Sequence, residues 1–183
     1  FEEALQKACR MLGVGAHGLV SAKNHFKEDD LHQLLEVPTE ERIFAIGEAF
    51  KRGWSVEKVH ELTKITPWFL QRVREVAKCQ KQIENYSLEK LPPPLFRCAK
   101  ELGFSDNQVA RSVDRPDPIP SGYQAALDVR DRREELGIRP VVKQIDTLAA
   151  EYPAQTNFLY MTYNGSTHDV VPKDPAPFVV LGG

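Results

Sequence analysis

Apolar residues recur every three or four positions through most of the chain, which is the spacing of one face of an α-helix. At the start of the chain, for example, Phe1, Leu5, Ala8, Cys9 and Leu12 share such a face. The repeat predicts helices over residues 1–12, 28–37, 40–52, 56–63, 68–85, 95–102, 106–113 and 123–136. We therefore expect a compact bundle of about seven or eight short helices.

Helix boundaries are marked by capping residues. Thr39, Ser55, Thr66 and Ser105 are candidate N-caps, and Pro67 suits the first position of the helix that follows Thr66. That helix is the longest, and we expect one of its faces to be buried. Its predicted inner positions are Phe69, Val73, Val76, Ala77, Gln80 and Ile83.

The helical pattern stops before residue 141. Residues 141–165 carry polar side chains throughout, which argues against a single buried strand, and their second half (158–163) is aromatic and β-prone. Asn164-Gly165 is a turn signal. We predict a mostly extended segment, a polar loop over 167–177 and the start of a β-strand over 178–183, so the fold class is mainly α.

Composition excludes several classes of protein. The formal net charge of −2 and the pI near 6.2 give no general basic field for nucleic acid or an anionic membrane. The sequence has no apolar run long enough to span a bilayer and no signal-peptide pattern. The three cysteines, Cys9, Cys79 and Cys98, form neither a metal pattern nor a disulfide framework. We expect an intracellular protein, cytoplasmic in the first place, with a mitochondrial location as the alternative.

The sequence offers no catalytic, cofactor-binding or metal-binding constellation. The histidines lack the spacing of metal ligands, and no Gly-rich phosphate loop is complete. Residues 55–70 and 103–113 have the form of helix-turn-helix units. A nucleic-acid-binding module is thus an alternative, but a groove-reading helix would not be expected to begin Trp68-Phe69-Leu70.

Large apolar residues concentrate in two neighbouring helices, where they belong either to the core or to an interface. We expect a self-association surface around residues 43–54 and 68–76, because a symmetric dimer needs one self-complementary patch. The interface candidates are Ile43, Phe44, Phe50, Trp54, Trp68, Phe69, Arg72 and Val76. A spacer that does not self-associate is the other alternative.

The chain resembles the synthetase region of carbamoyl-phosphate synthetase large subunits, in its eukaryotic branch. The resemblance runs in order along nearly the whole chain, over residues 1–8, 42–43, 55–70, 103–108, 142–151, 154–156, 160–163 and 179–183. Residues 13–28 and 115–122 depart from the family pattern and are expected to be surface variation.

This resemblance implies a helical oligomerisation domain between two ATP-grasp halves. Residues 1–12 would end the first ATP-grasp half, and residues 13–140 would form the helical domain. Residues 141–177 would connect this domain to the second half, which would begin at residues 178–183. Both ends then cut through larger domains. The parent would be a ligase that makes carbamoyl phosphate, for pyrimidine or arginine synthesis, from bicarbonate and ammonia delivered from glutamine.

The same resemblance implies the cofactors and partners. ATP and Mg or Mn would be bound by the parent enzyme, outside these residues. The partners would be the two ATP-grasp halves, a glutamine amidotransferase domain or subunit, and further copies of the chain. No nucleic acid and no membrane are expected as partners, and the fragment itself should not be catalytic.

Overall fold

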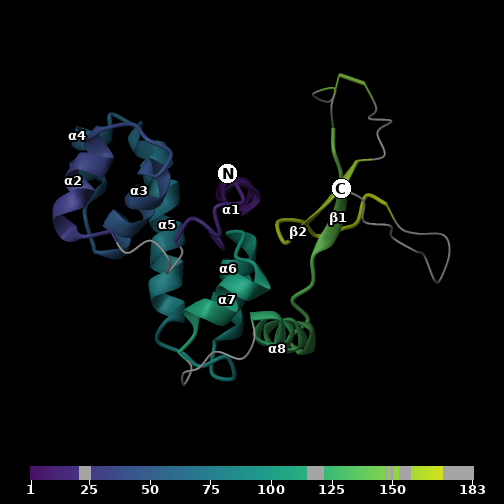
Figure 1. The fold of residues 1–183 in the computed structure, drawn as a ribbon. Coiled ribbons are helices and arrows are strands. Elements are labelled where there is room, and N and C mark those ends of the chain that lie inside the picture. The colour runs from purple at the N-terminus through teal and green to yellow at the C-terminus, as the bar shows by residue number, and fades with distance from the viewer. Residues whose placement is uncertain (21–25, 115–121, 147, 149–150, 153–157, 171–183) are drawn as a thin grey trace. The chain divides into compact units, whose positions relative to one another are not determined.

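A computed structural model describes residues 1–20, 26–114, 122–146, 148, 151–152 and 158–170. The chain divides into two compact units, Phe1–Ile138 and Arg139–Gly183, and each is described by itself. The first unit is helical and the second holds a two-stranded sheet (Figure 1). The mainly α class predicted from the sequence is confirmed.

The described part of the first unit contains eight helices. Their bounds are α1 (Glu2–Met11), α2 (Glu28–Glu36), α3 (Arg42–Lys51), α4 (Val56–Thr63), α5 (Pro67–Ile83), α6 (Pro93–Glu101), α7 (Asp106–Ser112) and α8 (Gly122–Glu135). Each lies within a few residues of a predicted helix, since the apolar repeat fixes the extent of a helix better than its ends.

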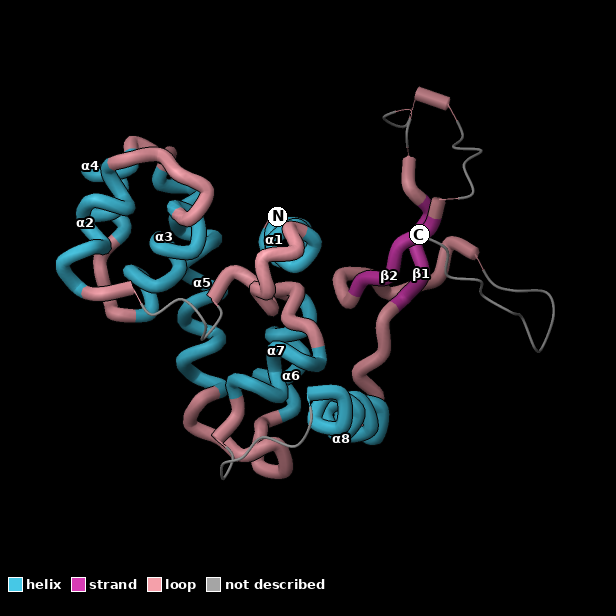
Figure 2. Tube along the Cα trace, viewed as in Figure 1, coloured by secondary structure: helices cyan, strands magenta, loops and turns pink. Residues whose placement is uncertain are grey.

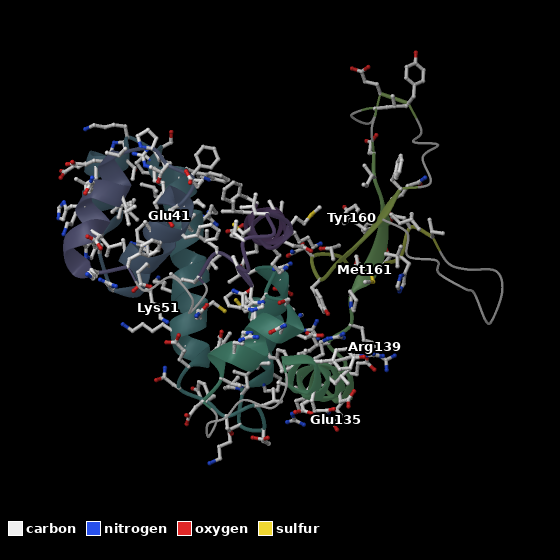
Figure 3. All side chains as sticks on the ribbon, viewed as in Figure 1. Glu41, Lys51, Glu135, Arg139, Tyr160 and Met161 are labelled. Carbon is white, nitrogen blue, oxygen red and sulfur yellow. The ribbon has the colours of Figure 1, made fainter. Side chains whose placement is uncertain are left out.

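Helix α5 is the centre of this unit. It packs against α1, α3, α4, α6 and α7, while α8 packs against α7. In Figure 1, α2, α3 and α4 lie together on one side of α5, and α6 and α7 lie on another. The buried face of α5 consists of Leu70, Val73, Val76, Ala77, Cys79, Gln80 and Ile83. At the C-terminal end of α5, the ammonium group of Lys51 on α3 lies 2.7 Å from the carboxylate of Glu84; Figure 3 labels Lys51.

Of the four predicted N-cap residues, two make the expected capping hydrogen bond and two do not. The backbone N–H groups of Lys58 and Gln108 donate to the hydroxyls of Ser55 and Ser105, at 3.1 and 3.0 Å. Thr66 occupies the N-cap position of α5, but its side chain makes no capping bond. Pro67 at the first helical position fixes the backbone there and has no N–H group to satisfy.

The predicted cap at Thr39 is wrong. Residues 39–41 form a turn, and α3 begins two residues later than expected, at Arg42. The Arg42 guanidinium donates to the carbonyl oxygens of Leu35 and Thr63, at 2.8 and 2.9 Å. These two long-range bonds anchor the first residue of the helix, which the isolated sequence signal could not reveal.

Helix α1 is joined to the turn between α6 and α7 by a buried amide. Gln6 is fully buried, and its side-chain oxygen accepts from the backbone N–H of Leu19 and the side-chain amide of Gln108, both at 3.1 Å. Its own amide donates to the Leu102 carbonyl at 3.3 Å. Through one side chain, segments about 100 residues apart are brought into a single unit.

A second polar cluster joins α6, α7 and α8. The buried Lys100 ammonium donates to the Asp106 carboxylate at 2.6 Å and to the Phe104 carbonyl at 2.7 Å. The Arg133 guanidinium meets the same carboxylate at 3.1 Å. Burial lowers the pKa of Lys100, and the negative charge of Asp106 acts in the opposite direction. The shared carboxylate compensates two cations that the fold takes out of water.

The second unit contains a short antiparallel ribbon. Strands β1 (Val141–Gln144) and β2 (Leu159–Thr162), magenta in Figure 2, pair with Val141 opposite Thr162 and Gln144 opposite Leu159. Within the predicted extended segment of residues 141–165, these two strands are extended and pair with each other; residues 147, 149–150 and 153–157 lie outside the described residues. The predicted strand over residues 178–183 and most of the loop over 167–177 lie outside the described residues.

Candidate assembly surface

Three aromatic side chains from the starts of α1 and α5 form a cluster on the surface of the first unit. The Phe1 ring lies 5.6 Å from the Trp68 ring and 5.4 Å from the Phe69 ring, and Trp68 and Phe69 meet edge to face at 5.0 Å. We call these three residues and Arg72 the aromatic patch. The two helices converge here because α1 packs against α5.

The patch is packed within itself, and the described residues leave it uncovered. Phe1, Trp68 and Phe69 keep 49%, 53% and 43% of their surface in solvent. The Arg72 guanidinium lies 5.6 Å from the Trp68 ring centroid, close enough for a cation–π contact, and 3.5 Å from the Glu2 carboxylate. The contacts of Arg72 with Trp68 and Glu2 therefore connect the two helices within the patch.

The structure separates the interface candidates into three groups. Phe44, Phe50 and Val76 are buried in the core of the first unit, so they have no surface to offer a partner. Ile43 and Trp54 are partly exposed. Trp54 contacts the Lys58 ammonium at 3.3 Å and the His32 ring at 5.0 Å.

The remaining candidates, Trp68, Phe69 and Arg72, come together in the aromatic patch. The prediction that Phe69 lies on the inner face of its helix is wrong, because Leu70 takes that position and is 1% exposed. Phe1 was missed as a surface residue. It shares the predicted apolar face of α1 with the buried Cys9, so nothing in the repeat distinguishes the two.

Of the two predicted helix-turn-helix units, residues 55–70 contain α4 and the start of α5, whereas residues 103–113 contain a single helix, α7. Both α5 and α7 are part of the core: α5 buries one face along its length, and the buried residues of α7 are Gln108, Val109, Ala110 and Ser112. The side chain of Arg72, on α5, is committed to Trp68 and Glu2. This geometry does not present a basic helix to a nucleic-acid groove.

Within the described ranges, no group of three or more His, Cys, Asp or Glu side chains is placed to hold a metal ion. None of the described helices is long and apolar enough to cross a membrane. What the first unit does offer is an apolar surface with a fixed arginine at its edge, which suits protein–protein contact.

The ribbon of the second unit carries apolar side chains of its own. Leu159, Tyr160 and Met161 of β2 are 48%, 44% and 63% exposed, and Figure 3 labels the last two. A two-stranded ribbon is marginally stable in water by itself. Its exposed side chains are therefore a second candidate contact surface.

Comparison with known proteins identifies the family. The family model described as carbamoyl-phosphate synthetase large chain, oligomerisation domain, matches residues 1–137. The chain is 42% identical over its whole length to the multifunctional protein pyr1-3 of Dictyostelium discoideum, covering 8% of that protein. It is 44% identical, again over its whole length, to the arginine-specific large chain of carbamoyl phosphate synthase from Eremothecium gossypii, covering 16%.

A mitochondrial arginine-specific large chain from Schizosaccharomyces pombe is 44% identical over 93% of this chain, which spans 14% of that relative. The chain therefore corresponds to a small part of much longer proteins. The match favours neither the nucleic-acid alternative nor a catalytic role for this segment. The chain belongs to the oligomerisation-domain family of carbamoyl-phosphate synthetase large chains.

Proposed function

We propose that this chain is the assembly domain of a carbamoyl-phosphate synthase and that its aromatic patch joins two copies of it. The observation that carries the proposal is the cluster of Phe1, Trp68 and Phe69, three large side chains that contact one another and are each about half exposed. Aromatic residues and arginine are the anchors that dominate protein interfaces. One patch that contacts itself across a two-fold axis is enough for a dimer.

The patch has the parts that a self-complementary contact needs. Its aromatic rings can stack against those of a second copy. Because each ring is already about half buried, it can contribute roughly half of the 150–250 Å² that an aromatic side chain buries in full. Arg72 and Glu2 stand next to each other at its edge, 3.5 Å apart. Across a two-fold axis, the arginine of one copy can therefore meet the carboxylate of the other.

The remaining proposals concern the whole protein. The parent would be a ligase making carbamoyl phosphate from bicarbonate and glutamine-derived ammonia, with ATP and Mg or Mn bound elsewhere in the chain. Residues 1–12 and 178–183 would belong to its two ATP-grasp halves and 141–177 would connect them. The exposed ribbon residues Leu159, Tyr160 and Met161 support contact with such a half. A glutamine amidotransferase domain or subunit would supply the ammonia, in the cytoplasm or a mitochondrion.

Sedimentation equilibrium of the 183-residue chain over a wide concentration range tests the assembly role. We expect a reversible monomer–dimer equilibrium. Trp68→Glu should raise the dimer dissociation constant at least about tenfold, because it places a charge where an aromatic anchor was buried. Tyr123→Glu is the matched control. Tyr123 is 78% exposed on α8, away from the patch, so this substitution should leave the dimer dissociation constant unchanged.

Circular dichroism is the control for folding, and we expect both variants to keep the helical signal because Trp68 and Tyr123 are 53% and 78% exposed. A chain that stays monomeric at every concentration would favour the spacer without self-association. A dimer that Trp68→Glu does not weaken would contradict the assignment of the patch while leaving self-association in place.

A further inference from the structure

Two cysteines on neighbouring helices share one pocket of the first unit. Cys79 lies on α5 and is buried, whereas Cys98 lies on α6 and is exposed. Helices α5 and α6 pack against each other, and each of the two thiols lies close enough to shift the pKa of the other. The third cysteine, Cys9, is buried on α1 and lies outside this pocket.

The pocket has the size of a small-molecule site and one more cation than carboxylates in its lining. Its volume is about 490 Å³, within the range of small-molecule sites. The lining includes Arg72, Lys78 and Lys81. Arg72 and Lys78 are ion-paired with Glu2 and Glu75 of the same lining, at 3.5 and 3.3 Å. The lining also includes the side chains of Gln82 and Asn85, which can donate hydrogen bonds.

We propose that Cys98 and Cys79 form a thiol–disulfide exchange site for glutathione disulfide, with Cys98 as the attacking thiol and Cys79 as the resolving thiol. The assignment of roles follows from access: a disulfide from solution can reach the exposed Cys98, whereas Cys79 is buried beside the same pocket. Lys81 gives the lining its one excess positive charge, and its ammonium can meet a carboxylate of glutathione.

The reaction has two balanced steps. The Cys98 thiolate attacks one sulfur of glutathione disulfide and forms a mixed disulfide, and the released glutathione thiolate takes up a proton. The Cys79 sulfur then attacks Cys98 Sγ, the mixed disulfide breaks, and the second glutathione leaves as a thiol with the Cys79 proton. Glutathione disulfide is reduced to two thiols, and the two cysteines are oxidised to one disulfide between α5 and α6.

Ionisation sets the order and the speed of these steps. Burial raises the pKa of Cys98, the neighbouring Cys79 acts to lower it, and the negative charges of Glu101 and Glu75 add to the increase. Burial and the neighbouring Cys98 raise the pKa of Cys79 to about 12. Cys98 therefore ionises first, and because few thiolates are present at neutral pH, the first step should accelerate about tenfold per pH unit below the Cys98 pKa.

The test is to incubate the reduced chain with glutathione disulfide at several pH values, quench with acid and follow the products by intact-mass and peptide mass spectrometry. We expect a Cys79–Cys98 disulfide, with Cys98 reacting at least about tenfold faster than the buried Cys9. Cys79→Ser should stop the reaction at the Cys98–glutathione adduct. Cys98→Ser should abolish both products, and Cys9→Ser should change neither.

Failure to form the Cys79–Cys98 disulfide in the native chain would overturn the proposal, as would its formation in urea at the same rate as in the native chain. A second comparison tests the choice of ligand. Lys81→Ala should slow the reaction with glutathione disulfide about two- to threefold but not the reaction with the neutral reagent dithiodipyridine. Lys90→Ala, an exposed lysine outside the pocket, is the control, and equal slowing by both variants would refute the glutathione assignment.

Discussion

At the scale of single residues, close contact between chain segments explains why some positions hold a particular amino acid, which the apolar repeat does not explain. Gly103 follows α6 with φ +90°, and a Cβ atom there would lie 2.6 Å from the Cα of Glu3. The Gly103 carbonyl also accepts from the Arg10 guanidinium at 2.8 Å. A helix-ending glycine is predictable from sequence, but the approach of α1 to it is not.

Gly103→Ala should therefore lower the free energy of unfolding by at least about 2 kcal/mol, since it combines a left-handed backbone with a backbone clash. Gly53→Ala is the matched control: Gly53 has φ +89°, but its Cβ would meet nothing within 4 Å. That variant should lose only about 1 kcal/mol. Urea unfolding of both variants measures the difference, and equal losses would show that α1 does not press on this turn.

Burial of the aromatic residues is also decided residue by residue. Phe44 and Phe50 are both 6% exposed, whereas Phe69 is 43% exposed. All three lie in predicted helices beside other apolar residues. The phase of a helix that starts at Pro67 places Leu70 inward and Phe69 outward, and a shift of one residue is about 100° of rotation. The sequence indicated the aromatic-rich region, and the helix packing selected which members form the patch.

At the scale of elements, the ends of helices show where a local signal is sufficient. Ser55 and Ser105 are N-caps in sequence and in structure, because a serine hydroxyl meets a backbone N–H of its own first turn. Thr66 has the right residue type and position, but its hydroxyl makes no such bond. Thr39 has the right residue type but lies in the turn before α3. Residue type thus identified two working caps among four candidates.

Ser55→Ala and Ser105→Ala should each lower the free energy of unfolding by about 1 kcal/mol through the lost capping bond. Thr66→Ala removes a hydroxyl from the same kind of position without removing a capping bond, so its effect should stay below about 0.5 kcal/mol. Chemical denaturation of the three variants provides the measurement. A loss at Thr66 as large as at the two serines would contradict the capping geometry described above.

At the scale of the whole molecule, long-range polar contacts make the helices into one unit. Gln6 joins α1 to residues 102 and 108, and the Lys100–Asp106–Arg133 cluster joins α6, α7 and α8. These contacts all lie within residues 1–138, the first compact unit. The ribbon of the second unit consists of two strands, too few for independent stability in water.

A chain cut after Ile138 should therefore keep its helical signal and unfold in one cooperative transition, within a few degrees of the Tm of the full chain. A peptide of residues 139–183 should show no stable strand by circular dichroism. Thermal unfolding of both pieces is the measurement. A truncated first unit that loses cooperativity would show that its core depends on the second unit.

The sequence by itself determined the mainly α class, the extent of the helices, the extended segment after residue 140 and the family, because these depend on local periodicity and on residue order along the chain. Only the tertiary structure decided which aromatic residues are exposed, that Cys79 and Cys98 line one pocket, and that Gln6 joins distant segments. The physical reason is the same for all three: each depends on how helices are rotated and packed against one another, and contacts between residues far apart in sequence leave no periodic signal.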